Sequence, residues 1–364
     1  MIQNSAIREF QNTLAKLKLD AALMNTSEVT RSVNLRRLSG FTGSDAALLI
    51  THNEAHLFTD GRYKAQSRIE CPQLRIHITK NKIKSIARII LSRNVDSMGL
   101  ETARISYEFV SVLKKMCPRV RLDRLKPGEL NVLRLRKTPD EVHKIRDAAH
   151  LASAACMEII SRGLSGKSES RVASELESLF REKGASGASF DTIVASGWRS
   201  ALPHGTATSR IIEAGELVII DYGCRFSDYC SDETVTCIVE NAPSPEQKKI
   251  YESVREAHDR AIDSIRPGIR TREVDQMARQ VIEKAGYGGN FLHSLGHGVG
   301  LEVHEAPYLS PRSAETLDIG MVFTIEPGVY IEGIGGVRLE SLVHLTESGR
   351  EILSTAPKDL IRAT

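Results

Sequence analysis

The chain has 364 residues, about twice the usual length of one compact domain, so we expect two domains. Hydrophobic residues make up 41% and charged residues 26%, which is typical of a soluble globular protein. The 49 basic and 46 acidic residues leave a net charge of only +3. This balance does not support the basic surface that binding of nucleic acid requires.

The N-terminal segment, residues 1–23, predicts an amphipathic helix, because Ile7, Phe10, Leu14 and Leu17 recur at helical spacing. It lacks the uninterrupted apolar stretch of a signal peptide, and no apolar run approaches the ~18 residues needed to cross a membrane. The six cysteines form no CxxC pair. We therefore expect a cytoplasmic protein with reduced thiols and no membrane partner.

The first third of the chain alternates helix and strand patterns. Ala46–Ile50 and Ala55–Phe58 are short apolar runs on either side of a polar turn, which predicts a hairpin. Helical patterns follow at residues 62–69, 83–91 and 107–116. The periodicity breaks around Pro127. We therefore predict a mixed α/β domain over residues 1–129 and a second domain over residues 130–364.

The second domain opens with a clear helix start, in which Thr138 is the N-cap and Pro139 the first helical residue. Long helices are predicted at residues 140–162, 167–183, 246–264 and 271–285. Strand patterns occupy Leu217–Tyr222, Tyr229–Val239, Met321–Val329 and Gly336–Leu345. Because the helices and the antiparallel-looking strands form separate blocks, we predict an α+β fold.

Asp221 and Asp232 are the first candidates for chemistry. Asp221 follows four apolar residues and closes a predicted buried strand. If the chain reverses at Phe226–Ser227, the two aspartates become cross-strand partners with Cβ atoms ~4.5–5.5 Å apart. Two ionised carboxylates so close repel each other unless cations lie between them, and a dinuclear site with metals ~3.5–4 Å apart has this geometry. The alternative is that both aspartates only shape turns.

Three of the eleven histidines, His293, His297 and His304, lie close together in the chain. Glycines on both sides of His297 allow the backbone to approach another group closely. They do not form a phosphate loop, because neither GxGxxG nor a trailing Gly-Lys-Ser/Thr is present. A single histidine is more often structural or solvent-facing, but the cluster favours a functional site.

Two glutamates lie in strand-like surroundings further along the chain. Glu326 follows an apolar strand that Pro327 ends, and burying an acid there is costly without a partner. Glu340 lies two residues from Arg338 on one strand face, so a plain salt bridge is the alternative interpretation of that pair.

Together these residues form a candidate set of metal ligands: Asp221, Asp232, His297, Glu326 and Glu340. The charges of four carboxylates are offset by two divalent cations. Oxygen-rich ligands with one imidazole suit Mn²⁺, Co²⁺ or Zn²⁺, and the set is not that of a thiolate site.

The motifs resemble those of the pita-bread metallopeptidases, and the proline-specific branch, aminopeptidase P and prolidase, matches best. The resemblance covers nearly the whole chain. In the second domain it rests on residues 195–205, Asp221…Asp232, His293-x-x-Gly-His297, Val303-His304-Glu, Thr324-Ile-Glu326-Pro-Gly and Arg338-Leu-Glu340. In the first domain, residues 39–44 and 59–63 resemble the smaller mixed α/β creatinase/prolidase-type domain, which methionine aminopeptidases lack.

The resemblance implies a pita-bread catalytic domain in which the five candidate ligands hold two divalent cations per chain, Mn²⁺ before Co²⁺ or Zn²⁺. Asp232 and Glu340 are expected to bridge the two ions. A hydroxide between the ions would be the nucleophile, and Glu326 would pass a proton to the leaving nitrogen.

The resemblance also gives roles to four further residues. His204 matches a histidine near the scissile carbonyl and leaving group, and His304 matches one that hydrogen-bonds the substrate amide. His293 and Arg338 match residues on the proline side of the pocket. Because the proline nitrogen of a peptide bond has no N–H, recognition is expected to rest on the shape of the ring.

The activity expected from the resemblance is that of an Xaa-Pro aminopeptidase, which releases the N-terminal residue from peptides with proline in second position. The alternative is an Xaa-Pro dipeptidase (prolidase), which has the same ligands but accepts only dipeptides. A more remote alternative is a metal-free creatinase-like hydrolase or a binding module, although such relatives have replaced their ligands. The resemblance also implies a homodimer.

One residue departs from the family pattern. The family usually carries an acid after the last glutamate, whereas this chain has Ser341 after Glu340. We do not expect a loss of metal from this change, but altered surroundings of the ligand and an altered metal affinity.

Overall fold

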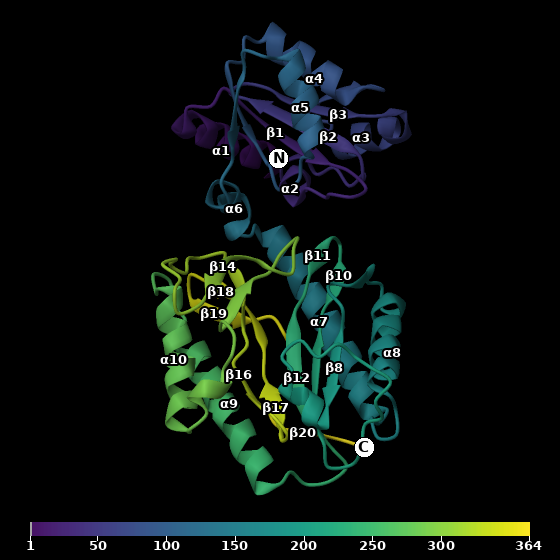
Figure 1. Cartoon of the computed structure of the whole chain (residues 1–364), viewed down its shortest axis with the longest axis vertical. Coiled ribbons are helices and arrows are strands. Elements are labelled where there is room, and N and C mark those ends of the chain that lie inside the picture. Colours follow the sequence, from purple (N-terminus) through teal and green to yellow (C-terminus); the bar gives the residue numbers. More distant parts are fainter. Residues whose placement is uncertain (1) are drawn as a thin grey trace. The chain divides into compact units, whose positions relative to one another are not determined.

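A mixed six-stranded sheet forms the centre of the first 134 residues. The computed structural model describes residues 2–364, with side chains from residue 5 onward. The chain divides into a first unit, Met1–Arg134, and a second unit, Leu135–Thr364 (Figure 1). Within residues 2–364, no helix combines the length and the apolar character needed to span a bilayer.

The sheet of the first unit has the strand order β4-β3-β2-β1-β5-β6. Its strands are β1 (Ala21–Thr26), β2 (Ala46–Thr51), β3 (Ala55–Thr59), β4 (Arg75–Ile78), β5 (Ser97–Leu100) and β6 (Arg121–Arg124). The helices are α1 (Ile2–Leu17), α2 (Val33–Ser39), α3 (Lys64–Glu70), α4 (Lys82–Ser92), α5 (Tyr107–Met116) and α6 (Pro127–Leu135), with a 3₁₀ turn η1 (Gly61–Tyr63). Side chains alternate between the two faces of a strand, so Leu48 packs with Phe10 of α1, while Leu49 packs with Ile86 of α4.

The predicted hairpin is confirmed, because β2 and β3 pair antiparallel across a turn closed by Thr51 N–H and the Glu54 carbonyl. The predicted N-terminal helix is too long. It ends at Leu17, since Lys18 adopts a left-handed conformation with φ 55°, and Ala21–Thr26 is a buried strand. Met1, the first residue of that prediction, lies outside the described residues. The break predicted around Pro127 is the start of α6, because proline is tolerated in a first helical turn.

In the second unit, two pairs of helices flank the strands. Figure 1 shows α7 (Pro139–Ser161) and α8 (Glu169–Glu182) along one side, and α9 (Pro245–Ser264) and α10 (Thr271–Lys284) along the other. The main sheets are β20-β12-β9-β8 and β14-β13-β15-β18-β19. Two smaller sheets have the orders β11-β10-β7 and β16-β17. This arrangement confirms the predicted α+β class.

Almost all strand pairs of the second unit are antiparallel, the exception being β12 with β20. The strands are β7 (Gly187–Ala188), β8 (Ile193–Ser196), β9 (Leu217–Tyr222), β10 (Cys224–Phe226), β11 (Tyr229–Cys230), β12 (Glu233–Val239), β13 (Gly296–Gly298), β14 (Glu305–Leu309), β15 (Val322–Ile325), β16 (Gly328–Ile331), β17 (Gly335–Arg338), β18 (Ser341–Thr346), β19 (Gly349–Ile352) and β20 (Ile361–Ala363). The 3₁₀ turns are η2 (Gly197–Ala201) and η3 (Gly288–Asn290).

Three of the predicted strand segments are interrupted, and each interruption holds a candidate ligand. Asp232 lies between β11 and β12, Glu326 between β15 and β16, and Glu340 between β17 and β18. Breaks in a ladder bend the chain and redirect side chains, and they are common beside functional sites. The break after Glu326 was predicted from Pro327, whereas the residue pattern does not reveal the breaks at Asp232 and Glu340.

The predicted pairing of Asp221 with Asp232 is wrong. The chain reverses at Ser227 and Asp228, which both have positive φ, so that Asp221 pairs with Thr234. The register is shifted because the turn lies one residue further along the chain than predicted. Paired residues point to the same face of a sheet, so Asp232, two residues before Thr234, still lies diagonally across from Asp221.

Replacing Thr138 by alanine should lower the unfolding free energy by about 1 kcal/mol, because its side chain caps α7. Thr138 accepts a hydrogen bond from Glu141 N–H while the Glu141 carboxylate accepts one from Thr138 N–H. Urea denaturation measures the change. Ser161→Ala at the exposed end of the same helix is the control and should stay within about 0.5 kcal/mol of the parent. Equal losses in both variants would contradict the capping role.

Candidate metal centre

A cavity of about 550 Å³ lies in the second unit. All the residues predicted for the site line it: His204, Asp221, Asp232, His293, His297, His304, Glu326, Arg338 and Glu340. The fold thus brings together β9, the interrupted strands and the segment that contains His293, His297 and His304.

Asp221 is held by Arg338 at the end of β9. An Arg338 N–H donates to Asp221 Oδ2 at 2.6 Å, and the same guanidinium donates to Thr234 Oγ1, the Pro203 carbonyl and the Tyr330 hydroxyl. Burial raises the pKa of Asp221, and Arg338 opposes this shift. The other oxygen, Oδ1, is buried without a hydrogen-bond partner. An unsatisfied buried carboxylate oxygen is costly, so this atom is available to a cation.

Asp232 and Glu340 are strongly destabilised as anions. Burial raises the pKa of both carboxyls well above the usual range, and neighbouring carboxylates raise it further. For Glu340 these neighbours are Glu326 and Asp221. Its Oε2 accepts one hydrogen bond, from Thr234 Oγ1 at 2.7 Å. Positive charge between these groups would remove the repulsion.

Glu326 behaves differently because it faces an imidazole. Burial acts to raise the pKa of Glu326, but the hydrogen bond with His297 and the surrounding positive groups lower it to about 2. Thr324 Oγ1 donates to Glu326 Oε1 at 3.2 Å and accepts from His297 N–H at 3.1 Å. Glu326 is therefore ionised and fixed in orientation.

His297 presents its Nε2 atom to the carboxylates. Nδ1 lies 3.1 Å from the Gly298 carbonyl and donates to it, which leaves Nε2 facing Glu326 at 3.3 Å and Asp232 at 3.6 Å. A lone pair on Nε2 would point at these acids, an arrangement that is favourable only with a proton or a metal ion between them. Burial lowers the pKa of His297, but Glu326 outweighs that effect and raises it.

The donor set therefore fits a divalent cation. One ligand atom each from Asp232, His297 and Glu340 lie within 4.8 Å of one another. Asp221 adds a buried oxygen without a partner, and Glu326 adds an ionised carboxylate. Carboxylates with one neutral imidazole suit Mn²⁺, Co²⁺ or Zn²⁺.

Three histidines line the rest of the cavity. Nδ1 of His293 lies 2.8 Å from the Ser294 carbonyl and donates to it, so its Nε2 accepts from the Tyr330 hydroxyl at 2.8 Å. His304 is exposed and packs edge-on against the His297 ring, with centroids 4.3 Å apart. His204 is exposed in the loop after η2.

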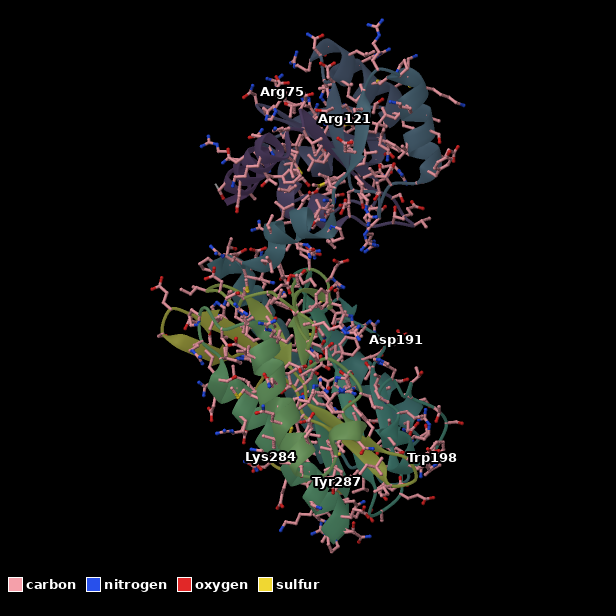
Figure 2. The ribbon with its side chains drawn as sticks, turned by 60° about the vertical axis from the view of Figure 1, so that its left-hand side comes forward. Arg75, Arg121, Asp191, Trp198, Lys284 and Tyr287 are labelled. Atoms are coloured by element: carbon pink, nitrogen blue, oxygen red, sulfur yellow. The ribbon has the colours of Figure 1, made fainter. Side chains whose placement is uncertain are left out.

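Several contributing residues were not predicted from the sequence. Tyr330 links Arg338 to His293, and Thr234 holds Arg338 and Glu340. Thr234 lies two residues after Asp232, and residues two apart in a strand face the same side. This spacing is the sequence signal that could have identified Thr234. Phe190 and Asp191 also line the cavity, and Figure 2 labels Asp191 on the second unit. No spacing pattern in the sequence singles out these two.

The glycines around His297 allow close packing, as predicted. A Cβ atom on Gly296 would lie 2.0 Å from the Thr324 carbonyl oxygen, and one on Gly298 would lie 2.1 Å from that of Ala306. Any side chain at either position would push β13 away from its neighbours and displace His297.

A cavity in which carboxylates and an imidazole converge, in a second unit of this α+β architecture, is that of a metal-dependent hydrolase of the pita-bread class. Residues 143–347 match the model of metallopeptidase family M24, and residues 7–137 match the creatinase/prolidase N-terminal domain. The chain belongs to metallopeptidase family M24.

Relatives match over the full length. An Xaa-Pro dipeptidase of Pyrococcus horikoshii is 37% identical over 362 residues, 99% of each chain. The solved structure of an Xaa-Pro dipeptidase from Bacillus anthracis has a TM-score of 0.94, with 37% identity and 99% of each chain covered. An X-Pro aminopeptidase from Thermotoga maritima has a TM-score of 0.90 and 35% identity, covering 97% of this chain and 100% of that one.

These findings correct the predicted activity. The prediction of an Xaa-Pro aminopeptidase is wrong, because the two Xaa-Pro dipeptidases are more similar to this chain in sequence than the X-Pro aminopeptidase is, and the solved dipeptidase also has the higher TM-score. The resemblance implied the same ligands for both activities, so these motifs do not distinguish the two lengths of substrate.

Replacing Arg338 by methionine should lower the unfolding free energy of the metal-free protein by about 3–5 kcal/mol, because it leaves a buried Asp221 carboxylate uncompensated. Denaturation in urea with a chelator measures this. Arg350→Met is the control, since its ion pair with Asp263 is largely exposed and worth at most about 1 kcal/mol. Similar losses in both variants would show that Asp221 does not depend on Arg338.

Proposed function

We propose that the protein is an Xaa-Pro dipeptidase that hydrolyses the bond between a first residue and a C-terminal proline with two divalent cations. The observation that carries the proposal is one cavity in which the four candidate carboxylate ligands converge on the Nε2 side of His297. Relatives named Xaa-Pro dipeptidase support the substrate class. A homodimer and a cytoplasmic location stay predictions.

In this proposal Asp221, Asp232, His297, Glu326 and Glu340 would hold the cations. Mn²⁺ is the ion we expect, with Co²⁺ and Zn²⁺ as alternatives. Bound cations polarise the scissile carbonyl and lower the pKa of an attacking water.

The side chains of the chain itself do the remaining work. Glu326 is ionised, so it accepts a proton from the attacking water and passes it to the proline nitrogen. His204 and His304 on the cavity wall hydrogen-bond the peptide around the bond that is cut. His293, oriented by Tyr330, and Arg338 border the proline side.

The cavity recognises the proline of the substrate by the shape of its ring. Its nitrogen has no N–H to donate, so the cavity must select the ring by its fit. Phe190, Ile193, Pro203 and Tyr308 supply apolar lining surface for this contact.

A peptide panel tests the substrate class. With Mn²⁺, an Xaa-Pro dipeptide should be cleaved with a kcat/KM at least about ten-fold above that of the Xaa-Pro-Xaa tripeptide with the same first residue, a free-energy difference of about 1.4 kcal/mol. The matching Xaa-Ala dipeptide is the control for proline. Equal cleavage of dipeptide and tripeptide would overturn the dipeptidase proposal, and metal analysis of the active protein should find about two ions per chain.

Asp232→Asn should lower kcat at least about a hundred-fold, because an amide would replace a carboxylate that is proposed to hold the cations. The metal-free variant should be at least as stable as the parent, since the raised pKa of Asp232 means that its charge costs folding free energy at neutral pH. Activity assays and thermal unfolding give the two readouts. Asp228→Asn at the hairpin turn is the control, because asparagine tolerates its left-handed backbone. Substantial activity in Asp232→Asn would refute the ligand assignment.

A further inference from the structure

The residue that departs from the family pattern, Ser341, lies where two of the proposed ligands meet. It directly follows Glu340 and begins β18, and it pairs across the sheet with Ile325, the residue before Glu326. Any movement of the backbone at Ser341 therefore shifts Glu340 and Glu326 together.

The Ser341 side chain points away from the cavity. Successive side chains of an extended chain face opposite sides, and Glu340 lines the cavity while Ser341 does not. On the far side, Ser341 Oγ lies 3.0 Å from Nε2 of His258, which belongs to α9. Both side chains are buried, with 1% and 3% exposure.

The hydrogen bonds of His258 have a defined direction. Nδ1 lies 3.1 Å from the Asp259 carboxylate and donates to it. Burial lowers the pKa of His258, which keeps the imidazole neutral, so Nε2 accepts the hydrogen bond of the Ser341 hydroxyl. Asp259, His258 and Ser341 thus form a chain of two hydrogen bonds that fixes the start of β18 to α9.

Asp259, His258 and Ser341 are the residue types of a nucleophilic triad, but a substrate has no access to the Ser341 hydroxyl. Ser341 is almost fully buried and is not among the residues that line the cavity, so no substrate carbonyl can reach its hydroxyl. The role that remains for these hydrogen bonds is to hold the backbone at the start of β18 in place.

We propose that His258 is a positioning residue for the metal centre, acting through Ser341 on Glu326 and Glu340. The inference rests on the ligand set of the proposed function and goes beyond it, since neither residue touches the cavity. Partners that orient metal ligands typically change metal affinity by 10–100-fold when they are removed. In this chain, position 341 carries a hydroxyl and not an acid. This hydroxyl positions the neighbouring ligands through its hydrogen bond with the neutral imidazole of His258.

A double-mutant cycle on metal binding tests the proposal with the full-length, chelator-treated protein. Ser341→Ala and His258→Leu should each weaken Mn²⁺ binding about ten-fold in titration calorimetry. The double variant should also lose about ten-fold and not about a hundred-fold, because both changes remove the same hydrogen bond. At saturating Mn²⁺, the kcat of each variant should return towards that of the parent.

A control separates positioning from general loss of stability. Ile262→Val in the same helix removes one buried methylene group and should lower the unfolding free energy by about 0.5–1.5 kcal/mol without changing Mn²⁺ affinity. Ser341→Ala alone decides the matter if His258→Leu does not fold.

The outcomes distinguish this inference from the proposed function. Single variants with Mn²⁺ affinity within two-fold of the parent, or a double variant whose loss is the product of the single losses, would overturn the role of His258. A parent protein that binds no Mn²⁺, Co²⁺ or Zn²⁺ would overturn the proposed function as well.

Discussion

Repulsion between buried carboxylates is the constraint on which the second unit depends. Asp221, Asp232, Glu326 and Glu340 line one cavity, and the pKa shifts of Asp232 and Glu340 record the cost of bringing them together. Two unit charges 4 Å apart at an effective dielectric constant of 20 repel each other by about 4 kcal/mol. A flexible scaffold would relax that cost by letting the acids separate. The scaffold must therefore be rigid, and the site must hold positive charge.

The rigidity comes from anchors on the outer side of the strands that carry the acids. Glu233 follows Asp232 in the chain, and its buried carboxylate accepts from the Tyr222 hydroxyl at 2.8 Å and from Lys358 Nζ at 2.6 Å. Ser341 follows Glu340 and meets His258 in the same way. At both places one residue faces the cavity and the next ties the strand to the surrounding structure. Because successive side chains of a strand face opposite sides, the candidate ligands are coupled to contacts outside the cavity, where no substrate binds.

The sequence was most informative where chemistry and local pattern coincide. The bounds of β9 and of the four long helices follow from apolar periodicity and from caps such as Thr138. Two ligand candidates, Asp221 and Glu326, follow from acids that end apolar runs. The breaks that hold Asp232 and Glu340 were not predictable, since periodicity cannot distinguish a bent strand from a straight one. The hairpin register was missed for a related reason. It depends on which residues adopt positive φ, and Ser227 and Asp228 compete with their neighbours for that role.

Substrate length was the other property that the motifs did not carry, and the charges of the cavity suggest a physical reason. A dipeptide ends in a carboxylate beside the proline ring, so a dipeptidase must meet that charge. Among the residues that line the cavity, Arg338 is the one guanidinium, and its donors are already directed at Asp221, Tyr330 and the Pro203 carbonyl. In the proposed activity the carboxylate is then met by groups other than these donors. Side chains in exposed loops can change without disturbing the ligands, so two chains with the same metal ligands can accept peptides of different length.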